Sequence, residues 1–144
     1  MKIPALFLIF CLFGALSAAG QDVAGRWKTI DDETGNPKSI VEIFERNGKM
    51  YGKIVRLFRG PDEDPDPVCD ECDEDDDRYL KKVIGMEIMR GMTSADGGAW
   101  SGGDILDPNN GKVYNCRIWL EGDNLKVRGY WGPFYRTQTW LKSQ

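Results

Sequence analysis

A series of short strand-like runs over residues 98–141 constrains the fold of this chain more than any other feature of the sequence. The turns between the runs include Asn110-Gly111 and Gly122-Asp123-Asn124, whose residues tolerate the positive φ angles that tight hairpins need. The runs themselves are rich in β-branched and aromatic residues, which favour strands. The pattern predicts an antiparallel meander with strands over 100–106, 112–121, 125–132 and 134–140.

Alternation within this meander predicts which side of each strand is buried. Successive side chains of a strand point to opposite faces of the sheet. Apolar residues recur at every second position, whereas Asn115, Arg117, Lys126 and Arg128 occupy the positions between them. One face is therefore expected to be buried, and it carries Tyr114, Cys116, Ile118, Leu120, Leu125, Val127, Gly129 and Trp131.

The first half of the chain adds four more expected strands. Residues 23–29 and 39–46 alternate in polarity, and Asn47-Gly48, a strong hairpin signal, connects the second of these runs to 49–58. The segment 80–92 is apolar around residues 83–92 and is interpreted as a strand, with a helix as the alternative. Gly85 within it permits a kink or bulge.

Eight short strands in sequence order predict an all-β fold. Closing the sheet into an antiparallel up-and-down barrel removes the unpaired edges that an open sheet would expose. A sandwich of two sheets is the alternative. We favour the barrel, because hairpins between neighbouring strands suit an up-and-down order.

The N-terminus has the composition of a signal peptide. Lys2 precedes an apolar stretch over residues 3–16, and Ser17, Ala18, Ala19 and Gly20 provide the small residues that signal peptidase requires. Residues 1–20 are therefore predicted to be removed, which leaves a single β-barrel domain over 21–144. The apolar stretch is shorter than a membrane span requires. The protein is expected to be exported, either periplasmic or secreted, with no transmembrane span after the leader is removed.

Charge and composition exclude several classes of function. The formal net charge is −4, and 11 of the 16 residues over 62–77 are acidic, so nucleic acid is not an expected partner. Prolines and charge density in this segment oppose regular structure and predict a long exposed loop.

The chain contains no histidine, which removes the usual neutral-pH general base and the commonest metal ligand. We therefore expect a protein that is not an enzyme.

Cys69 and Cys72 lie within the acidic segment and allow four interpretations. An oxidising compartment favours a local disulfide that pins the loop. A redox centre would need surroundings that stabilise a thiolate, but the neighbouring carboxylates oppose one. A zinc site would lack good further ligands, and a bridge to Cys116 also remains open. We favour the Cys69–Cys72 disulfide, with Cys116 as a buried free thiol in the core.

The alternating carboxylates of Asp62, Asp64 and Asp66 resemble the start of a calcium loop. Pro67 stands where such a loop usually needs glycine for a sharp turn, and Asp73 stands where it needs a bidentate glutamate. No cofactor is expected, and weak calcium binding is the alternative to a solvated acidic loop.

Aromatic and aliphatic side chains are expected to fill or line the interior of the barrel. Eight strands leave room either for a packed core or for one small ligand, and the sequence does not separate the two. The candidate lining residues are Trp27, Ile43, Tyr114, Ile118, Val127 and Trp131.

Several short motifs in a fixed order resemble the bacterial exported family catalogued as domain of unknown function 2147. The resemblance spans essentially the whole mature chain and implies a lipocalin-like barrel. The motifs are Gly25-Arg26-Trp27, Lys38 to Ile43, Tyr51 to Val55, Cys69 to Cys72, Gly103 to Pro108, Gly111 to Tyr114, Leu125 to Tyr130 and Arg136 to Trp140.

The Gly25-x-Trp27 motif is also similar to the first-strand signature of lipocalins. In that family the tryptophan closes the base of the barrel, and an arginine from a late strand packs over it. The resemblance implies this part for Arg136 or Arg128, and Arg136 therefore joins the candidate ligand-binding residues.

Two functional hypotheses follow. The first is an exported, non-enzymatic barrel that binds a small hydrophobic or amphipathic molecule, with Trp27 and Arg136 closing one end. The alternative is an interaction scaffold whose loop, residues 62–77, binds divalent cations or a basic protein partner.

Overall fold

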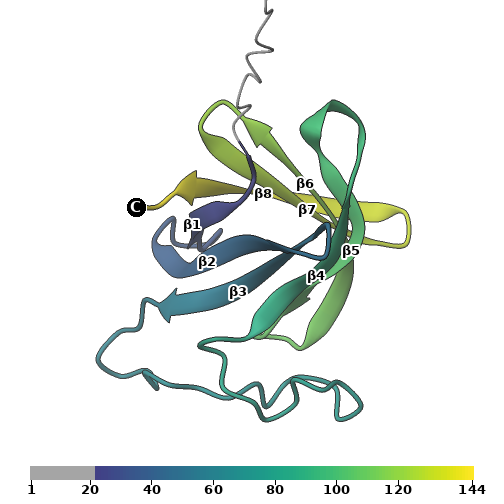
Figure 1. The fold of residues 1–144 in the computed structure, drawn as a ribbon. Coiled ribbons are helices and arrows are strands. Elements are labelled where there is room, and N and C mark those ends of the chain that lie inside the picture. The colour runs from purple at the N-terminus through teal and green to yellow at the C-terminus, as the bar shows by residue number, and fades with distance from the viewer. Residues whose placement is uncertain (1–21) are drawn as a thin grey trace, which may run out of the picture.

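A computed structural model describes residues 22–144, which form a closed barrel of eight antiparallel strands (Figure 1). Each strand pairs with the next along the chain, and the last pairs with the first. The predicted all-β up-and-down barrel is therefore confirmed. The predicted signal peptide, residues 1–20, lies outside the described residues. The strands are β1 (Gly25–Ile30), β2 (Pro37–Arg46), β3 (Lys49–Leu57), β4 (Glu87–Ser94), β5 (Trp100–Asp107), β6 (Lys112–Glu121), β7 (Asn124–Trp131) and β8 (Phe134–Lys142).

Tight turns at one end of the barrel follow the predicted chemistry. Asn47 and Gly48 join β2 to β3 with φ angles of 54° and 78°, the left-handed conformation that this kind of hairpin requires. In an up-and-down barrel, alternate connections emerge at opposite ends. The β1–β2, β3–β4, β5–β6 and β7–β8 connections therefore share the other end, which we call the loop end.

The barrel interior carries the apolar face that alternation predicts. Cys116, Ile118, Leu125 and Val127 are all buried. Further buried residues from other strands complete a continuous core: Trp27, Val41, Ile43, Met50, Ile54, Ile88, Met89, Met92, Leu106 and Trp140. Packing of this face against itself across the barrel is the main stabilising contribution to the fold.

The fourth strand begins later than the sequence indicates. The expected strand over 80–92 is wrong at its start, because β4 runs from Glu87 to Ser94. Val83 and Met86 are buried nonetheless, because the chain before β4 folds back on itself. The Val83 amide donates to the Pro67 carbonyl oxygen at 2.9 Å, so this apolar segment completes the preceding loop.

Regular helix is confined to one short 3-10 turn, Asp96–Gly98, within the described residues. Over that same part of the chain, no helix has the length and apolar character needed to cross a membrane.

Candidate functional site: a cavity at the loop end

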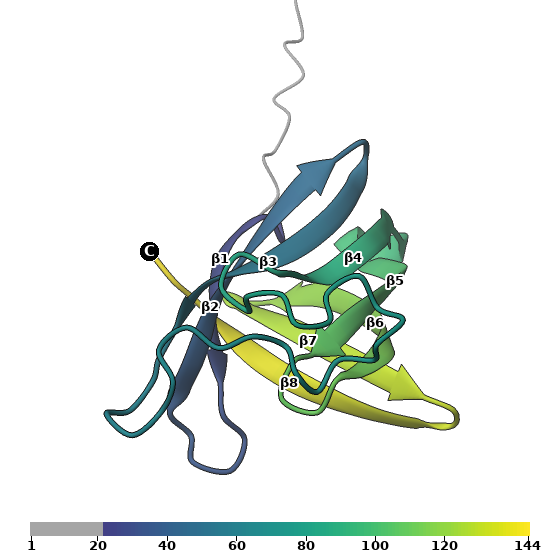
Figure 2. The ribbon, with the colours of Figure 1, turned by 90° about the horizontal axis from the view of Figure 1, so that it is seen from below.

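The long connection between β3 and β4, residues 58–86, lies across the loop end of the barrel (Figure 2). Its many carboxylates help to fold it. The Asp64, Asp73 and Asp76 side chains each accept a hydrogen bond from the backbone amide two residues further on, at 2.9 Å in all three cases. This local pairing replaces the hydrogen bonds that a strand or helix would provide. The acidic run therefore forms a sequence of tight turns.

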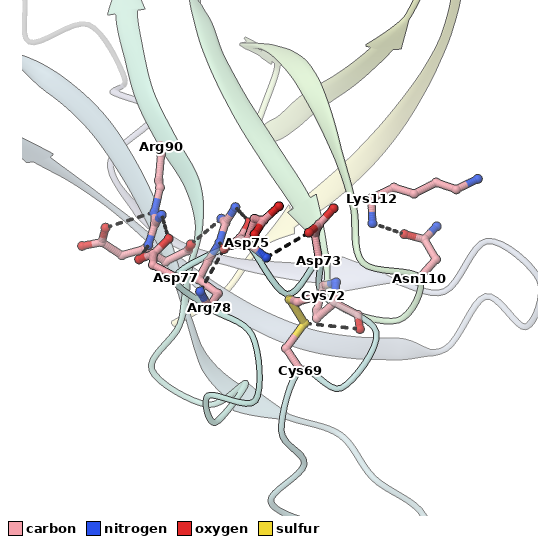
Figure 3. Close-up of polar contacts among 12 residues, drawn as sticks. Cys69, Cys72, Asp73, Asp75, Asp77, Arg78, Arg90, Asn110 and Lys112 are labelled. Carbon is pink, nitrogen blue, oxygen red and sulfur yellow. Dashed lines mark hydrogen bonds and ion pairs between the residues drawn. A yellow bond between two sulfur atoms is a disulfide. The ribbon is translucent and has the colours of Figure 1, made fainter.

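Arg78 anchors the middle of this loop to the barrel. Only 6% of its surface is exposed. Its guanidinium donates two hydrogen bonds to the Asp76 carboxylate, at 2.8 and 2.9 Å, and a third to the Glu87 carbonyl oxygen at the start of β4, at 3.0 Å. The hydrogen bonds from Arg78 hold the pKa of Asp76 well below its usual range. The Asp77 carboxylate pairs in the same way with Arg90 on β4 (Figure 3).

The other side of the loop is held by a disulfide between Cys69 and Cys72, as predicted (Figure 3). Both cysteines are buried against the turn between β5 and β6. The Cys69 sulfur lies 3.9 Å from the carbonyl oxygen of Pro108. Gly111, with φ of 71°, faces the Glu71 backbone so closely that a Cβ there would overlap the Glu71 carbonyl oxygen. The close approach of loop and turn thus depends on a glycine.

A cavity of about 900 Å³ lies between this loop and the barrel interior. Its apolar wall comes mainly from inward-facing strand residues, and its polar lining comes from strand ends and from the β1–β2, β3–β4 and β5–β6 connections. The apolar wall includes Ile54, Leu57, Val83, Ile88, Val127 and Trp140, and the polar lining includes Thr29, Asp31, Lys38, Ser39, Arg59, Glu63, Asp70, Glu71, Asn109, Asn110, Arg136 and Gln138.

A chain of hydrogen bonds runs from the apolar wall to the polar rim. The Trp140 indole N–H donates to the Gln138 side-chain oxygen at 3.2 Å, and the Gln138 amide donates to the Asp32 carboxylate at 3.0 Å. Asp32, on the β1–β2 connection, also forms an ion pair with Arg136 on β8. Deeper in the lining, the Thr29 and Ser39 hydroxyls share a hydrogen bond of 2.7 Å. The cavity therefore offers an apolar interior together with fixed polar groups at one side.

The structure separates the candidate lining residues into two groups. Tyr114, Val127, Trp131 and Arg136 line the cavity. The other three, Trp27, Ile43 and Ile118, are buried in the packed part of the barrel core and are not part of the lining.

The expected pairing of Trp27 with an arginine is wrong. Trp27 is next to Lys142 in the register of β1 and β8, so Arg136 lies six residues away along β8, which is roughly 20 Å in an extended strand. Arg128 stacks over the Trp119 and Tyr135 rings on the outer face instead. The Trp27 indole N–H donates to the Val23 carbonyl oxygen at 2.8 Å, so the segment before β1 satisfies the polar group of this tryptophan.

Comparison with known proteins shows which family this chain belongs to and which solved structure it resembles. A family described as "Uncharacterized protein conserved in bacteria (DUF2147)" matches residues 25–142, which is nearly the whole described chain. The chain belongs to this family. The solved structure of protein HP1028 from the human pathogen Helicobacter pylori, described as belonging to the lipocalin family, is similar, with a TM-score of 0.72 and 19% sequence identity. The likeness covers 87% of this chain and 85% of that chain, and at this identity it shows the fold alone. The curated proteins contain no match.

In this DUF2147 member, several lining residues were absent from the sequence-based set. Ile54, Ile88 and Trp140 form part of the apolar wall, and Gln138 connects it to the rim. Alternation along β8 is the signal that could have found Gln138 and Trp140, because both share a face with Arg136.

Asp62, Asp64 and Asp66, the residues of the alternative calcium-binding interpretation, are distributed along the exposed start of the loop. Asp66 forms an ion pair with Lys82 at 2.8 Å, and Asp64 accepts the Asp66 amide. Across residues 22–144, no three acidic or sulfur-containing side chains lie close enough together to bind a metal ion. Asp62, Asp64 and Asp66 therefore do not form a metal site in this structure.

Cys116 is a buried free thiol on β6, as predicted. Burial, together with the nearby Asp104 carboxylate, raises the pKa of this thiol to about 12. The side chain is therefore protonated at neutral pH and acts as a small apolar group in the core.

Proposed function

We propose that this protein is an exported, non-enzymatic barrel that holds a small amphipathic molecule in the cavity at its loop end. The observation that supports this most strongly is the lining of the cavity, which has an apolar wall of strand residues and polar groups on one side. Its volume of about 900 Å³ is within the range of small-molecule sites in proteins. The apolar part of the ligand would contact Ile54, Val127 and Trp140, and its polar part would lie near Gln138 and Arg136.

The absence of catalysis is part of this proposal. The chain has no histidine, and the Cys116 thiol is buried and protonated, so neither a neutral-pH base nor a thiolate nucleophile supports a reaction in the cavity. Export is supported by the signal-like N-terminus and by the Cys69–Cys72 disulfide, which oxidising compartments favour.

The alternative function, an interaction scaffold that uses the 62–77 loop, receives less support. Asp66, Asp76 and Asp77 already pair with basic side chains of the same chain. Their carboxylates therefore stabilise the loop in its position over the barrel and are less available to a cation or a basic partner.

A substitution that fills the cavity tests whether it is the ligand site. We expect Val127→Trp to lower the affinity for the fluorescent amphipathic probe anilinonaphthalene sulfonate at least tenfold, because Val127 is buried on the cavity wall and the larger ring occupies ligand volume. The measurement is a fluorescence titration of the folded protein, with the circular dichroism spectrum as the check on folding.

Val113→Trp is the matched control, because Val113 is exposed on β6 and outside the cavity lining. This variant is expected to bind the probe as the wild type does. A folded Val127→Trp protein that retains the wild-type affinity and stoichiometry would contradict the proposal. Should Val127→Trp fail to fold, Gln138→Leu provides a second test at the polar side, with an expected affinity change of about tenfold from the lost hydrogen bonds.

A further inference from the structure

Two buried hydroxyl groups lie where the packed core of the barrel ends and the cavity begins. Register pairs Thr29 on β1 with Ser39 on β2, and these residues are only 8% and 6% exposed, respectively. Both line the cavity. The next inward-facing pair on the same two strands, Trp27 and Val41, belongs to the packed core. The hydroxyl pair therefore forms part of the base of the cavity.

This hydroxyl pair has one hydrogen-bond donor to spare. The Thr29 and Ser39 hydroxyls share a hydrogen bond of 2.7 Å, in which one donates and the other accepts. Each hydroxyl carries one hydrogen, so the accepting hydroxyl keeps an O–H that donates to no other group among residues 22–144. A buried donor without an acceptor costs free energy, and an acceptor on a bound molecule would recover that cost.

Gln138 provides a second free donor on the same side of the cavity. Its side-chain oxygen already accepts from the Trp140 indole, and its side-chain nitrogen donates to Asp32. That nitrogen carries two hydrogens, and one of them has no acceptor within the described part of the chain. Continuing the β1–β8 register by one residue brings Thr29 beside Trp140. The spare hydroxyl and amide hydrogens therefore belong to neighbouring strands of one wall.

The charges around the cavity oppose a charged ligand group at this wall. Three lining carboxylates form no ion pair among residues 22–144: Asp70, Glu71 and Asp107. Each of the three basic residues in the lining has an acidic counterpart: Arg136 with Asp32, Arg59 with Glu63, and Lys38 with Asp31. The remaining field is negative and disfavours an anion. A cation cannot accept a hydrogen bond, so it would leave the free donors unsatisfied.

We propose that the ligand of this cavity carries an uncharged hydrogen-bond acceptor, such as an ester or ketone oxygen, that binds the Thr29–Ser39 hydroxyl pair and the free amide hydrogen of Gln138. This inference rests on the proposed function and names the chemical class of the ligand's polar part. An uncharged acceptor satisfies the free donors without bringing a charge into a buried site. The apolar remainder of the ligand packs against the strand residues of the cavity wall.

Isothermal titration calorimetry with four ligands of closely similar shape tests this inference. Methyl 4-phenylbutyrate carries a neutral acceptor, 4-phenylbutyrate an anion, 4-phenylbutylammonium a cation, and butylbenzene no polar group. We expect the ester to bind about tenfold more tightly than either ion, because only the ester satisfies the donors without a desolvated charge. This comparison uses the wild-type protein, so it does not depend on the folding of any variant.

Thr29→Val combined with Ser39→Ala removes both hydroxyls and leaves neither partner orphaned, so the fold is expected to persist. The affinity for the ester should fall about tenfold, whereas the affinity for butylbenzene should stay within about twofold of the wild-type value. Thr137→Val combined with Thr139→Val is the matched control. These two hydroxyls accept hydrogen bonds from β7 side chains and lie outside the cavity lining, so their removal should leave ester binding unchanged.

The outcomes separate this inference from the proposed function. Tighter binding of either ion than of the ester, no binding of the ester, or an equal loss of ester and butylbenzene affinity in the hydroxyl-free variant would overturn the inference. Ester binding that Val127→Trp does not weaken would instead contradict the proposed function, because the ligand would then lie outside the cavity.

Discussion

Gly111→Ala is expected to release the 58–86 loop from the barrel and to accelerate amide hydrogen exchange at Cys69, Leu80 and Lys81 by about 100-fold. A Cβ at Gly111 would overlap the Glu71 carbonyl oxygen, and the residue also has a φ of 71°, which alanine adopts at a cost. The clash would be between the new Cβ at position 111 and the backbone oxygen of Glu71. Neither atom belongs to a flexible side chain, so the clash can be relieved only by displacing the loop. The exchange factor corresponds to roughly 3 kcal/mol of lost stability for the closed loop.

The three amides report directly on loop closure, because they donate hydrogen bonds within the loop, to Lys81, Cys69 and Arg78 respectively. Gly122→Ala is the matched control. Gly122 has a similar φ of 61° but no atom within 4 Å of a Cβ, so it carries the backbone cost without the clash. Equal hydrogen-exchange rates of the loop amides in Gly111→Ala and Gly122→Ala would show that the contact between Glu71 and Gly111 does not hold the loop closed. We also expect Gly111→Ala to weaken probe binding, since the loop forms one side of the cavity.

Asp76→Asn is expected to lower the free energy of unfolding by about 3 kcal/mol at neutral pH. The substitution keeps the shape of the side chain but leaves the buried Arg78 guanidinium without its charged partner, and breaking one side of a buried ion pair is costly. The measurement is urea denaturation. Asp75→Asn, which removes the same charge from an exposed position of the same loop, is expected to change stability by less than about 0.5 kcal/mol.

The pH dependence of this difference has a definite sign. Arg78 lowers the pKa of Asp76 in the folded protein below its ordinary value of 3.8. A depressed folded pKa stabilises the protein above the unfolded pKa, and that stabilisation is lost as pH falls toward the folded value. The difference between wild type and Asp76→Asn should therefore be constant above about pH 5 and shrink below about pH 4. A difference that grew on acidification would show that Asp76 is not held as a carboxylate by Arg78.

The parts of this structure that depend on local chemistry could be predicted from the sequence. Asn47-Gly48 specified a hairpin, and alternation around Cys116 and Ile118 identified the buried face, because turn conformation and strand period are properties of neighbouring residues. The Cys69–Cys72 disulfide also followed from local spacing and compartment.

The division between packed core and cavity could not be predicted in this way. Period-two alternation says which face a residue occupies, but its height inside the barrel depends on how the strands are staggered when the sheet closes. Ile43 and Ile118 therefore belong to the packed core, whereas Val127 lines the cavity, although all three face inward. Trp131 shares the inward face of β7 but is half exposed, because the hairpin extends beyond the barrel.

The sequence also underestimated how many residues of the 58–86 loop are buried, for a related reason. Its charge and prolines indicated an exposed segment over 62–77, yet Cys69 and Cys72 within it and Arg78 next to it are buried. These burials depend on contacts with β4 and with the β5–β6 turn, which are distant in sequence. Val83 and Met86, which the sequence placed in a strand, are buried because the chain before β4 folds back on the loop.

Native mass spectrometry of the protein purified gently from its own exported pool tests the central claim most directly. We predict a leader-free chain that carries a small amphipathic molecule in stoichiometric amount, which denaturing extraction releases for identification. The bound mass should be absent from Val127→Trp and present in Val113→Trp. A bare mass for the wild type and for Val113→Trp, together with no saturable binding of the fluorescent probe, would contradict the assignment of the cavity as a ligand site.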